Sequence, residues 1–277
     1  MGATTKVIIG GITGRMGRAA ARAILEDPEL ELIGGFAGAN SAACGQDIAL
    51  LPDVAVKMTG ILVSNEINAC LAEVKPDVYL DFTKADVAVL NVESAIEHGL
   101  SPVIGTSGIT PQLFERFSEL SKAKNVPGLV VPNFSVGAVL MIEFARQAAS
   151  LFNQTEIVEM HHTNKVDAPS GTAMYTLKKM AGENKNFNPI SVQEKELIPG
   201  ARGGRDESGI RVHSLRLPGL ISHQEVLFGS EGELLSIRHD SFNTSCFTKG
   251  IVLALKKVRS LNGFQIGLEH VLPKLSG

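Results

Sequence analysis

The chain has 277 residues and a formal net charge of −3; 44% of its residues are hydrophobic and 20% are charged. These values are ordinary for a globular protein of one or two domains. The small negative charge and the scarcity of aromatic residues, 5% with no Trp, exclude a global basic field and argue against a base-stacking surface. We therefore expect neither a nucleic-acid partner nor binding to an anionic membrane.

Cysteine usage and the N-terminus bear on the compartment. Cys44, Cys70 and Cys246 are far apart and form no Cys-x-x-Cys pair, so a disulfide framework is not expected and a reducing compartment is. The N-terminus has no long apolar stretch before a cleavage site, and no segment is expected to span a membrane. We expect a cytoplasmic protein; a mature organellar protein without its transit peptide would have the same pattern.

The first elements are typical of dinucleotide binding. A short apolar strand is expected over residues 6–10 and an alanine-rich helix over residues 19–25. Between them lie Gly11, Gly14 and Gly17, which permit a tight turn, a close backbone approach to a pyrophosphate, and packing of helix on strand, respectively. The alternative is a tight strand-to-helix turn that binds nothing.

The end of the second expected strand, residues 30–36, bears on the choice of cofactor. Folds that bind NAD usually carry an acidic residue there for the ribose 2′-hydroxyl. This chain has Ala37 and Gly38 instead, while Arg15 and Arg18 follow the glycine turn. The pattern favours a 2′-phosphate, and hence NADPH over NADH, unless both arginines are only solvated residues at a helix start.

Strands and helices then alternate, which predicts an α/β fold with a Rossmann-like, doubly wound parallel sheet. Ligands of such sheets bind at the carboxyl ends of the strands. Three segments are expected to share that edge with the glycine turn: Phe82-Thr83, Gly105-Thr106-Ser107 and Pro132-Asn133-Phe134. The expected strands cover residues 54–58, 78–83, 102–108 (with a loop) and 129–132, and the helices cover residues 85–98 and 111–124.

The pattern changes after residue 134. A long helix over residues 135–152 is followed by consecutive strands, which predicts a second, α+β domain with a mixed, mostly antiparallel sheet. Residues 183–209 are expected to form a long loop, which is uncommon unless functional. The expected strands cover residues 210–217, 221–228 and 233–239, and the expected domains are residues 1–134 with a C-terminal helix in 245–277, and residues 135–244.

The segment from residue 157 to residue 173 contains a helix start that suits an anion. An apolar strand leads in, and Ser170 is a good N-cap for a helix over residues 173–180. A helix N-terminus attracts anions through its unpaired N–H groups and its dipole. Ser170, Gly171 and Thr172 would offer N–H and hydroxyl groups to such an anion.

The same segment carries groups that could bind a carboxylate and donate a proton. If the strand stays extended to residue 165, Glu159, His161, Thr163 and Lys165 share one face, whereas His162 needs a bend to join them. Three alternatives compete with this interpretation. They are a metal site on the histidines and Glu159, although no third spaced ligand is evident, ordinary strand histidines, and a surface ion pair between Lys165 and Asp167.

These residues resemble the signature of the 4-hydroxy-tetrahydrodipicolinate reductase (dihydrodipicolinate reductase) family. The run His-His-x-x-Lys-x-Asp-Ala-Pro-Ser-Gly-Thr from His161 to Thr172 is highly specific, and the resemblance covers nearly the whole chain. Other motifs match in order and spacing: Gly14-Arg15-Met16-Gly17, Asp81-Phe82-Thr83, Gly105-Thr106-Ser107-Gly108 and Asn133-Phe134-Ser135-Val136-Gly137.

The resemblance implies an NAD(P)H-dependent oxidoreductase of lysine biosynthesis through diaminopimelate, assembled as a homotetramer. It implies hydride transfer to C4 of a cyclic dicarboxylate after loss of the 4-hydroxyl, followed by protonation. His161 would be the acid/base residue and Lys165 the proton donor, while His162, Lys165, Gly171 and Thr172 would hold the substrate carboxylate. No metal is implied. The implied cofactor contacts, together with Phe82, are Gly11, Ile12, Thr13, Gly14, Arg15, Met16, Gly105, Thr106, Ser107, Val131, Pro132, Asn133 and Phe134.

The chain departs from the family pattern in two places. The acid that usually ends the second strand is absent, and residues 239–245 lack an arginine often found there. Two other classes of function are alternatives to this one. A non-catalytic nucleotide sensor would have no need of His161 and Lys165 as proton donors. A dehydrogenase for another substrate, such as an amino-acid semialdehyde, is disfavoured by the Lys-x-Asp-Ala-Pro-Ser-Gly-Thr run.

Overall fold

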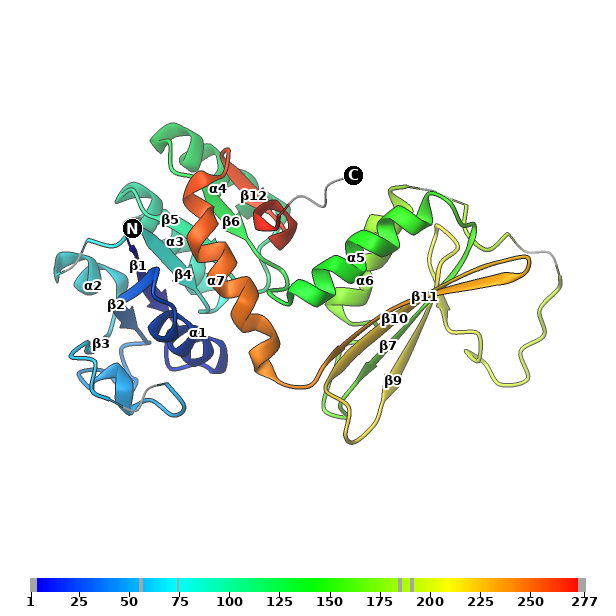
Figure 1. The fold of residues 1–277 in the computed structure, drawn as a ribbon, viewed down its shortest axis with the longest axis horizontal. Coiled ribbons are helices and arrows are strands. Elements are labelled where there is room, and N and C mark those ends of the chain that lie inside the picture. Colours follow the sequence, from blue (N-terminus) through cyan, green and yellow to red (C-terminus); the bar gives the residue numbers. More distant parts are fainter. Residues whose placement is uncertain (1–3, 55–56, 74, 184–185, 190–191, 274–277) are drawn as a thin grey trace. The chain divides into compact units, whose positions relative to one another are not determined.

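The computed structural model describes residues 4–273 except residues 55–56, 74, 184–185 and 190–191. The chain divides into two compact units, residues 1–136 with 247–277, and residues 137–246 (Figure 1). The domain limits expected from the sequence, at residues 134 and 245, lie close to these limits.

The first unit is built on a seven-stranded sheet in which every pairing is parallel. Its strands are β1 (Thr5–Gly10), β2 (Leu30–Phe36), β3 (Val63–Ser64), β4 (Val78–Asp81), β5 (Ser101–Ile104), β6 (Gly128–Val130) and β12 (Phe264–Ile266). They lie in the order β12-β6-β5-β4-β1-β2-β3. Val7, Ile8 and Ile9 are fully buried, as expected for a strand covered on both faces. The predicted Rossmann-like sheet is confirmed.

Helices pack on this sheet in two groups. They are α1 (Arg15–Glu26), α2 (Ile67–Glu73), α3 (Ala85–Glu97), α4 (Pro111–Lys124) and α7 (Thr248–Lys257). The last helix, α7, packs against α1 and β1, whereas α3 and α4 pack against each other (Figure 1). The bounds of α4 follow from local chemistry, because Thr110 caps its N-terminus, Pro111 begins it and Asn125 ends it in a left-handed conformation.

The second unit is a five-stranded sheet with two helices on one face. The strands are β7 (Gln154–His161), β8 (Gly204–Arg205), β9 (Arg211–Arg216), β10 (Ser222–Ser230) and β11 (Glu233–Ser241), and the helices are α5 (Val136–Ala149) and α6 (Gly171–Ala181). The order is β11-β10-β7-β9-β8, and only the β7–β9 pairing is parallel among the described strands. The predicted mixed, mostly antiparallel sheet is confirmed.

Strand β7 places its residues alternately on the two faces of this sheet. Thr155, Ile157, Glu159 and His161 are buried, while the residues between them are only partly buried. The buried face packs against α5 and α6 in one apolar cluster. The period of two therefore sends Glu159 and His161 to the same, covered face.

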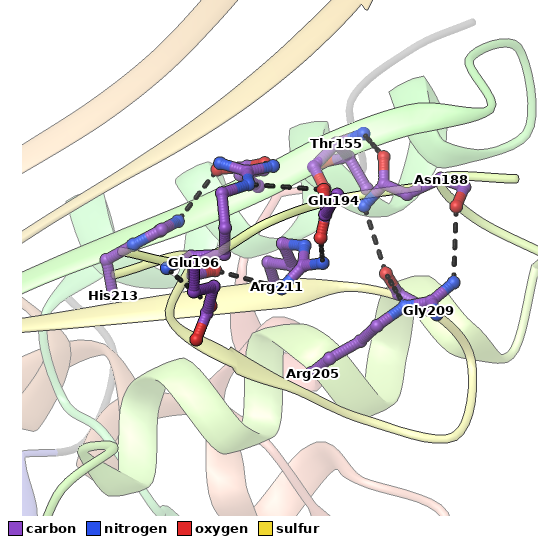
Figure 2. Close-up of polar contacts among 10 residues, drawn as sticks. Thr155, Asn188, Glu194, Glu196, Arg205, Gly209, Arg211 and His213 are labelled. Carbon is purple, nitrogen blue, oxygen red and sulfur yellow. Dashed lines mark hydrogen bonds and ion pairs between the residues drawn. The ribbon is translucent and has the colours of Figure 1, made fainter. Parts of the chain in front are cut away.

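Hydrogen bonds and ion pairs hold the long loop expected over residues 183–209 against the sheet of the second unit (Figure 2). Asn188 accepts a hydrogen bond from the backbone N of Thr155 and donates to the carbonyls of Thr155 and Gly209, at 2.7–3.0 Å. Further along, Arg202 pairs with Glu156 at 2.6 Å and with Glu194 at 3.3 Å. The described part of this loop is thus held by specific partners, and only the short strand β8 interrupts it.

Two expectations about strands are wrong. The strand expected over residues 54–58 is absent from the described positions 54, 57 and 58, which are turn, bend and coil, and residues 55–56 lie outside the description. Strand β7 ends at His161 rather than continuing to residue 165, since the backbone N of Lys165 donates to the His162 carbonyl across a turn. Lys165 therefore does not share a strand face with His161.

Candidate active site

The glycine turn between β1 and α1 has the geometry that dinucleotide binding requires. Gly11 has φ +74°, and a Cβ placed there would lie 2.5 Å from the Phe82 carbonyl oxygen, so only glycine fits. Gly14 is the N-cap of α1 and no side chain caps it. The first turn of α1 also lacks an acidic residue. The N–H groups and positive dipole end of α1 are therefore available to an anion.

A cleft of about 610 Å³ opens beside this turn, within the size range of cofactor sites. The sequence predicted four of its lining residues, namely Gly11, Thr13, Gly14 and Phe82, and it singled out Ala37 and Gly38 as the end of the second strand. Thr83 was expected at the same edge as Phe82. No signal in the sequence indicated Asn65 and Glu66, which follow β3, or Val87 and Asn91 on α3, because these elements bring them from distant positions. Phe36, at the end of β2, and Lys84, which follows Thr83, complete the lining.

A buried carboxylate fixes the loops that follow β4 and β5. Asp81 is fully buried. It accepts hydrogen bonds from the backbone N and Oγ1 of Thr83, at 2.9 and 2.8 Å, and from the hydroxyls of Tyr79 and Thr106. Burial raises the pKa of the Tyr79 phenol, and the nearby Asp81 charge raises it further. Phe82-Thr83 and Thr106 are thus held at one sheet edge, as the sequence predicted for parallel strand ends.

Glycine at position 105 lets two aromatic rings meet at the same edge. The rings of Phe82 and Phe134 pack edge to face with centroids 5.5 Å apart, and a Cβ on Gly105 would lie 2.2 and 2.7 Å from them. The other predicted cofactor residues differ in exposure. Ile12 and Val131 are buried, Met16 and Asn133 are partly buried, and Arg15, Ser107 and Pro132 are exposed.

In the second unit, sheet register places two polar side chains beside His161. Arg216 is its partner on β9 and Ser222 its partner on β10. Ser222 Oγ lies 3.1 Å from His161 Nε2. Neither Arg216 nor Ser222 was singled out from the sequence, since pairing between strands about 60 residues apart leaves no local signal.

Glu159 is the centre of this arrangement. It has no exposed surface, and its carboxylate contacts His161 Nδ1 at 2.5 Å and both terminal nitrogens of Arg216 at 2.8 and 3.0 Å. Burial raises the pKa of Glu159, but the hydrogen bonds from His161 and Arg216 outweigh burial and lower it to about 2. Glu159 is therefore a carboxylate at neutral pH, with both oxygens engaged.

The loop after β7 carries the predicted lysine. Lys165 Nζ donates to Asp167 Oδ1 at 2.7 Å, and this hydrogen bond lowers the pKa of Asp167. Arg216 reaches the same loop through the Asp167 carbonyl at 2.8 Å. Contacts therefore run from His161 through Glu159 and Arg216 to Asp167 and Lys165. His162 is exposed at the start of the turn.

Helix α6 begins as the sequence predicts. Ser170 Oγ accepts from the backbone N of Ala173 at 3.2 Å, which confirms the N-cap, and Ser170 N donates to Glu159 at 3.3 Å. Gly171 is exposed at the first helical position and Thr172 is partly buried. In the part of the chain that the structure describes, no three His, Cys, Asp or Glu side chains gather as a metal site.

Comparison with known proteins identifies the family. A model described as dihydrodipicolinate reductase, N-terminus, matches residues 5–134, and one described as dihydrodipicolinate reductase, C-terminus, matches residues 137–272. The chain belongs to the dihydrodipicolinate reductase family. Members of this family are oxidoreductases of the diaminopimelate route to lysine. The family resemblance predicted from the sequence is confirmed.

Individual relatives match over nearly their full length. The chain is 42% identical to 4-hydroxy-tetrahydrodipicolinate reductase from Moorella thermoacetica, covering 98% of each chain. It is 43% identical to that of Streptococcus pneumoniae, covering 96% of this chain and 99% of the relative. A dipicolinate-bound dihydrodipicolinate reductase from Paenisporosarcina sp. TG-14 superposes with a TM-score of 0.87 at 34% identity, covering 97% of this chain and 100% of that one. No helix among the described residues is long and apolar enough to cross a membrane.

Proposed function

We propose that the chain reduces 4-hydroxy-tetrahydrodipicolinate to tetrahydrodipicolinate with NADPH as the preferred cofactor. Family membership over the whole chain carries this proposal. The glycine turn and its cleft fit a nicotinamide dinucleotide, because Gly11, Thr13 and Gly14 line the cleft at the N-terminus of α1, which has no side-chain cap and no acidic residue in its first turn. When bound, the cofactor supplies the hydride.

The residues of the second unit supply the proton and hold the substrate. His161 presents its Nε2 edge beside Ser222 and acts as the acid/base residue, and Lys165 donates a proton from its ammonium group. The N–H groups of Gly171 and Thr172 at the start of α6 bind a substrate carboxylate together with Lys165 and His162. Ser170 contributes mainly by capping, since its hydroxyl already accepts from Ala173.

The function is tested by following NADPH oxidation with substrate made fresh from pyruvate and aspartate semialdehyde by the preceding synthase. We expect oxidation only when synthase, both of its substrates and this chain are all present. A rate no higher than that of a blank without the chain would refute the function. Replacing the synthase product with the semialdehyde alone tests the alternative dehydrogenase.

NADPH is expected to give a kcat/KM about tenfold above that of NADH, the effect of roughly one added charged hydrogen bond. The end of β2 offers no carboxylate to a ribose, Lys84 lines the cleft, and Arg15 is exposed on the first turn of α1. Arg18 is less suited, because it donates to the Thr13 carbonyl at 2.7 Å. Initial rates with both cofactors check this, and Arg15→Ala should lower kcat/KM for NADPH alone; equal values for the two cofactors would contradict it.

Gly171→Ala is expected to raise the substrate KM about 10- to 100-fold, since an added methyl displaces a carboxylate from a charged hydrogen bond worth about 1.5–3 kcal/mol. A Cβ at Gly171 meets no atom within 4 Å, so the fold should tolerate it. Gly229→Ala, which is equally unobstructed in β10, is the matched control. Both variants should have the melting temperature of the parent protein. An unchanged KM in Gly171→Ala would show that Gly171 does not contact the substrate.

The assembly proposed is a cytoplasmic homotetramer. One face of the second unit's sheet packs against α5 and α6, and the opposite face carries apolar side chains. Leu215 and Leu234 on that face are 37% and 70% exposed. A surface of this kind supports association between copies of the chain.

A further inference from the structure

A buried ion pair behind His161 has no role in the reaction proposed above. Glu159 and Arg216 meet through two parallel hydrogen bonds of 2.8 and 3.0 Å, the bidentate geometry typical of strong Arg–carboxylate pairs. Glu159 has no exposed surface, and the Arg216 side chain is 19% exposed. A carboxylate so deeply buried is retained only with such a partner.

The ion pair decides which nitrogen of His161 carries a proton. Glu159 is ionised and has no proton to donate, so the 2.5 Å contact to His161 Nδ1 requires the proton to lie on Nδ1. In the neutral ring, Nε2 then carries the lone pair and accepts a hydrogen bond from Ser222 Oγ, 3.1 Å away. Because Nδ1 remains hydrogen-bonded to Glu159, Nε2 is the ring nitrogen that can exchange a proton with the substrate.

We propose that Glu159 and Arg216 are positioning residues that hold His161 as the Nδ1–H tautomer and aim Nε2 at the substrate. The inference rests on the acid/base role of His161 proposed above. Arg216 orients the carboxylate, and the carboxylate orients and polarises the imidazole. The arrangement parallels the carboxylate–imidazole pairs of other enzymes, in which the carboxylate fixes tautomer and orientation.

The contacts around Glu159 predict what an amide at this position would do. One carboxylate oxygen accepts from Arg216 and from the backbone N of Ser170, and the other from Arg216 and His161. In Glu159→Gln, the amide oxygen would replace the carboxylate oxygen that accepts from Arg216 and Ser170 N. A guanidinium and a backbone N–H can only donate, so this position requires an acceptor. The amide NH₂ would then face His161 Nδ1, which must become an acceptor, so the proton would move to Nε2.

The charged surroundings of His161 set the sign of the expected pH effect. Arg216 approaches from β9, the Lys165–Asp167 pair lies in the loop after β7, and β10 contributes the uncharged Ser222 and Gln224. Glu159 is the negative charge that touches the ring, and it favours the imidazolium. Glu159→Gln removes this charged partner of the ring, so the fall in kcat with rising pH should move to lower pH.

The opposite face of β7 supplies a matched control. Glu156 contacts His213 Nε2 at 2.7 Å and Arg202 at 2.6 Å, so it repeats the carboxylate–histidine–arginine grouping. Figure 2 shows His213 in this grouping, on the sheet face that carries the long loop. Glu156→Gln removes a comparable set of contacts from the same strand without touching His161.

The test compares Glu159→Gln, Glu159→Asp and Glu156→Gln in the synthase-coupled assay across pH, with ¹⁵N NMR of protein labelled at its seven histidines. The His161 signals are assigned by their absence in His161→Ala. We expect Glu159→Gln to lower kcat about 10²- to 10⁴-fold, to move the fall in kcat to lower pH, and to convert His161 to the Nε2–H tautomer. Glu159→Asp should recover part of kcat, and Glu156→Gln should match the parent protein.

A merely structural role for Glu159 would lower stability without changing the tautomer or the pH profile. If Glu159→Gln does not fold, the double variant Glu159→Gln, Arg216→Gln removes both charges and is measured in the same way. An Nδ1–H tautomer and an unshifted profile in a folded variant would overturn the proposal. Absence of turnover in the parent protein would instead refute the proposed function, and the NMR tautomer would still test the role of Glu159.

Discussion

Replacing His161 or Lys165 with alanine is expected to lower kcat about 10²- to 10⁴-fold, the usual contribution of a positioned general acid. His161 is held between Glu159 and Ser222, and Lys165 is held by Asp167, so each donor is placed before substrate binds. Initial rates at saturating substrate and cofactor measure the effect. Cofactor affinity should be unchanged, because these residues belong to the second unit.

Two substitutions serve as controls for this prediction. His213→Ala removes a histidine that is also bonded to a glutamate, and Lys178→Ala removes an exposed lysine from α6. Both should retain the parent kcat. Full activity in His161→Ala or Lys165→Ala would show that the role assigned to that residue is wrong.

The variants Gly14→Ala and Gly17→Ala are expected to differ: the first should weaken cofactor binding alone, and the second should also destabilise the fold. A Cβ at Gly17 would lie 2.3 Å from the Gly11 carbonyl oxygen and 2.7 Å from Ile12 Cα, so backbone must move, at a cost of about 1–3 kcal/mol or more. At Gly14 the nearest atom is 3.2 Å away and φ is −71°. Gly14→Ala should therefore fold but crowd the pyrophosphate.

Urea unfolding and NADPH titration measure the two effects. We expect Gly17→Ala to lose both stability and cofactor binding. Gly14→Ala should keep its unfolding midpoint and weaken NADPH binding about tenfold or more, equivalent to about 1.4 kcal/mol. Parent-like NADPH affinity in Gly14→Ala would contradict the assignment of this turn to the cofactor.

Elements whose signals are local could be predicted from the sequence. The buried run Val7 to Ile9 marks β1, Thr110 with Pro111 fixes the start of α4, and Ser170 fixes the start of α6. In each of these cases a side chain satisfies or replaces a backbone group within a few residues. The alternation of strands and helices, and its end near residue 134, was likewise sufficient for the fold class.

Elements that depend on distant pairing could not be predicted. Strand β3 exists because Val63 pairs with Gly35, and β12 because Phe264 pairs with Gly128; each has only two or three residues and no periodicity of its own. Arg216 and Ser222 reach His161 through sheet register. The expectation that His161 and Lys165 share a strand face was wrong, because a turn after His161 ends the strand and its alternation of side chains.

The site residues therefore differ in how far sequence could locate them. His161, Lys165 and Gly171 lie in one short run, and the resemblance to a family assigned their roles. The alternation of side chains along a strand predicted that Glu159 and His161 share a face. The ion pair between Glu159 and Arg216 could not be predicted, because the pairing of β7 with β9 brings the two residues together. Residues 239–245, where the sequence departs from the expected family pattern, run from the end of β11 into the 3₁₀ helix Thr244–Phe247 before α7.

The most direct test of the central claim is the transfer of deuterium from cofactor to product. The chain is supplied with NADPH that carries deuterium at both positions of C4 of the nicotinamide, and with substrate formed by the synthase in ordinary water. The product is analysed by NMR. We predict one deuterium at C4 of the tetrahydrodipicolinate ring. Oxidation of NADPH without deuterium in the product, or deuterium at another ring carbon, would contradict a hydride reduction at this position.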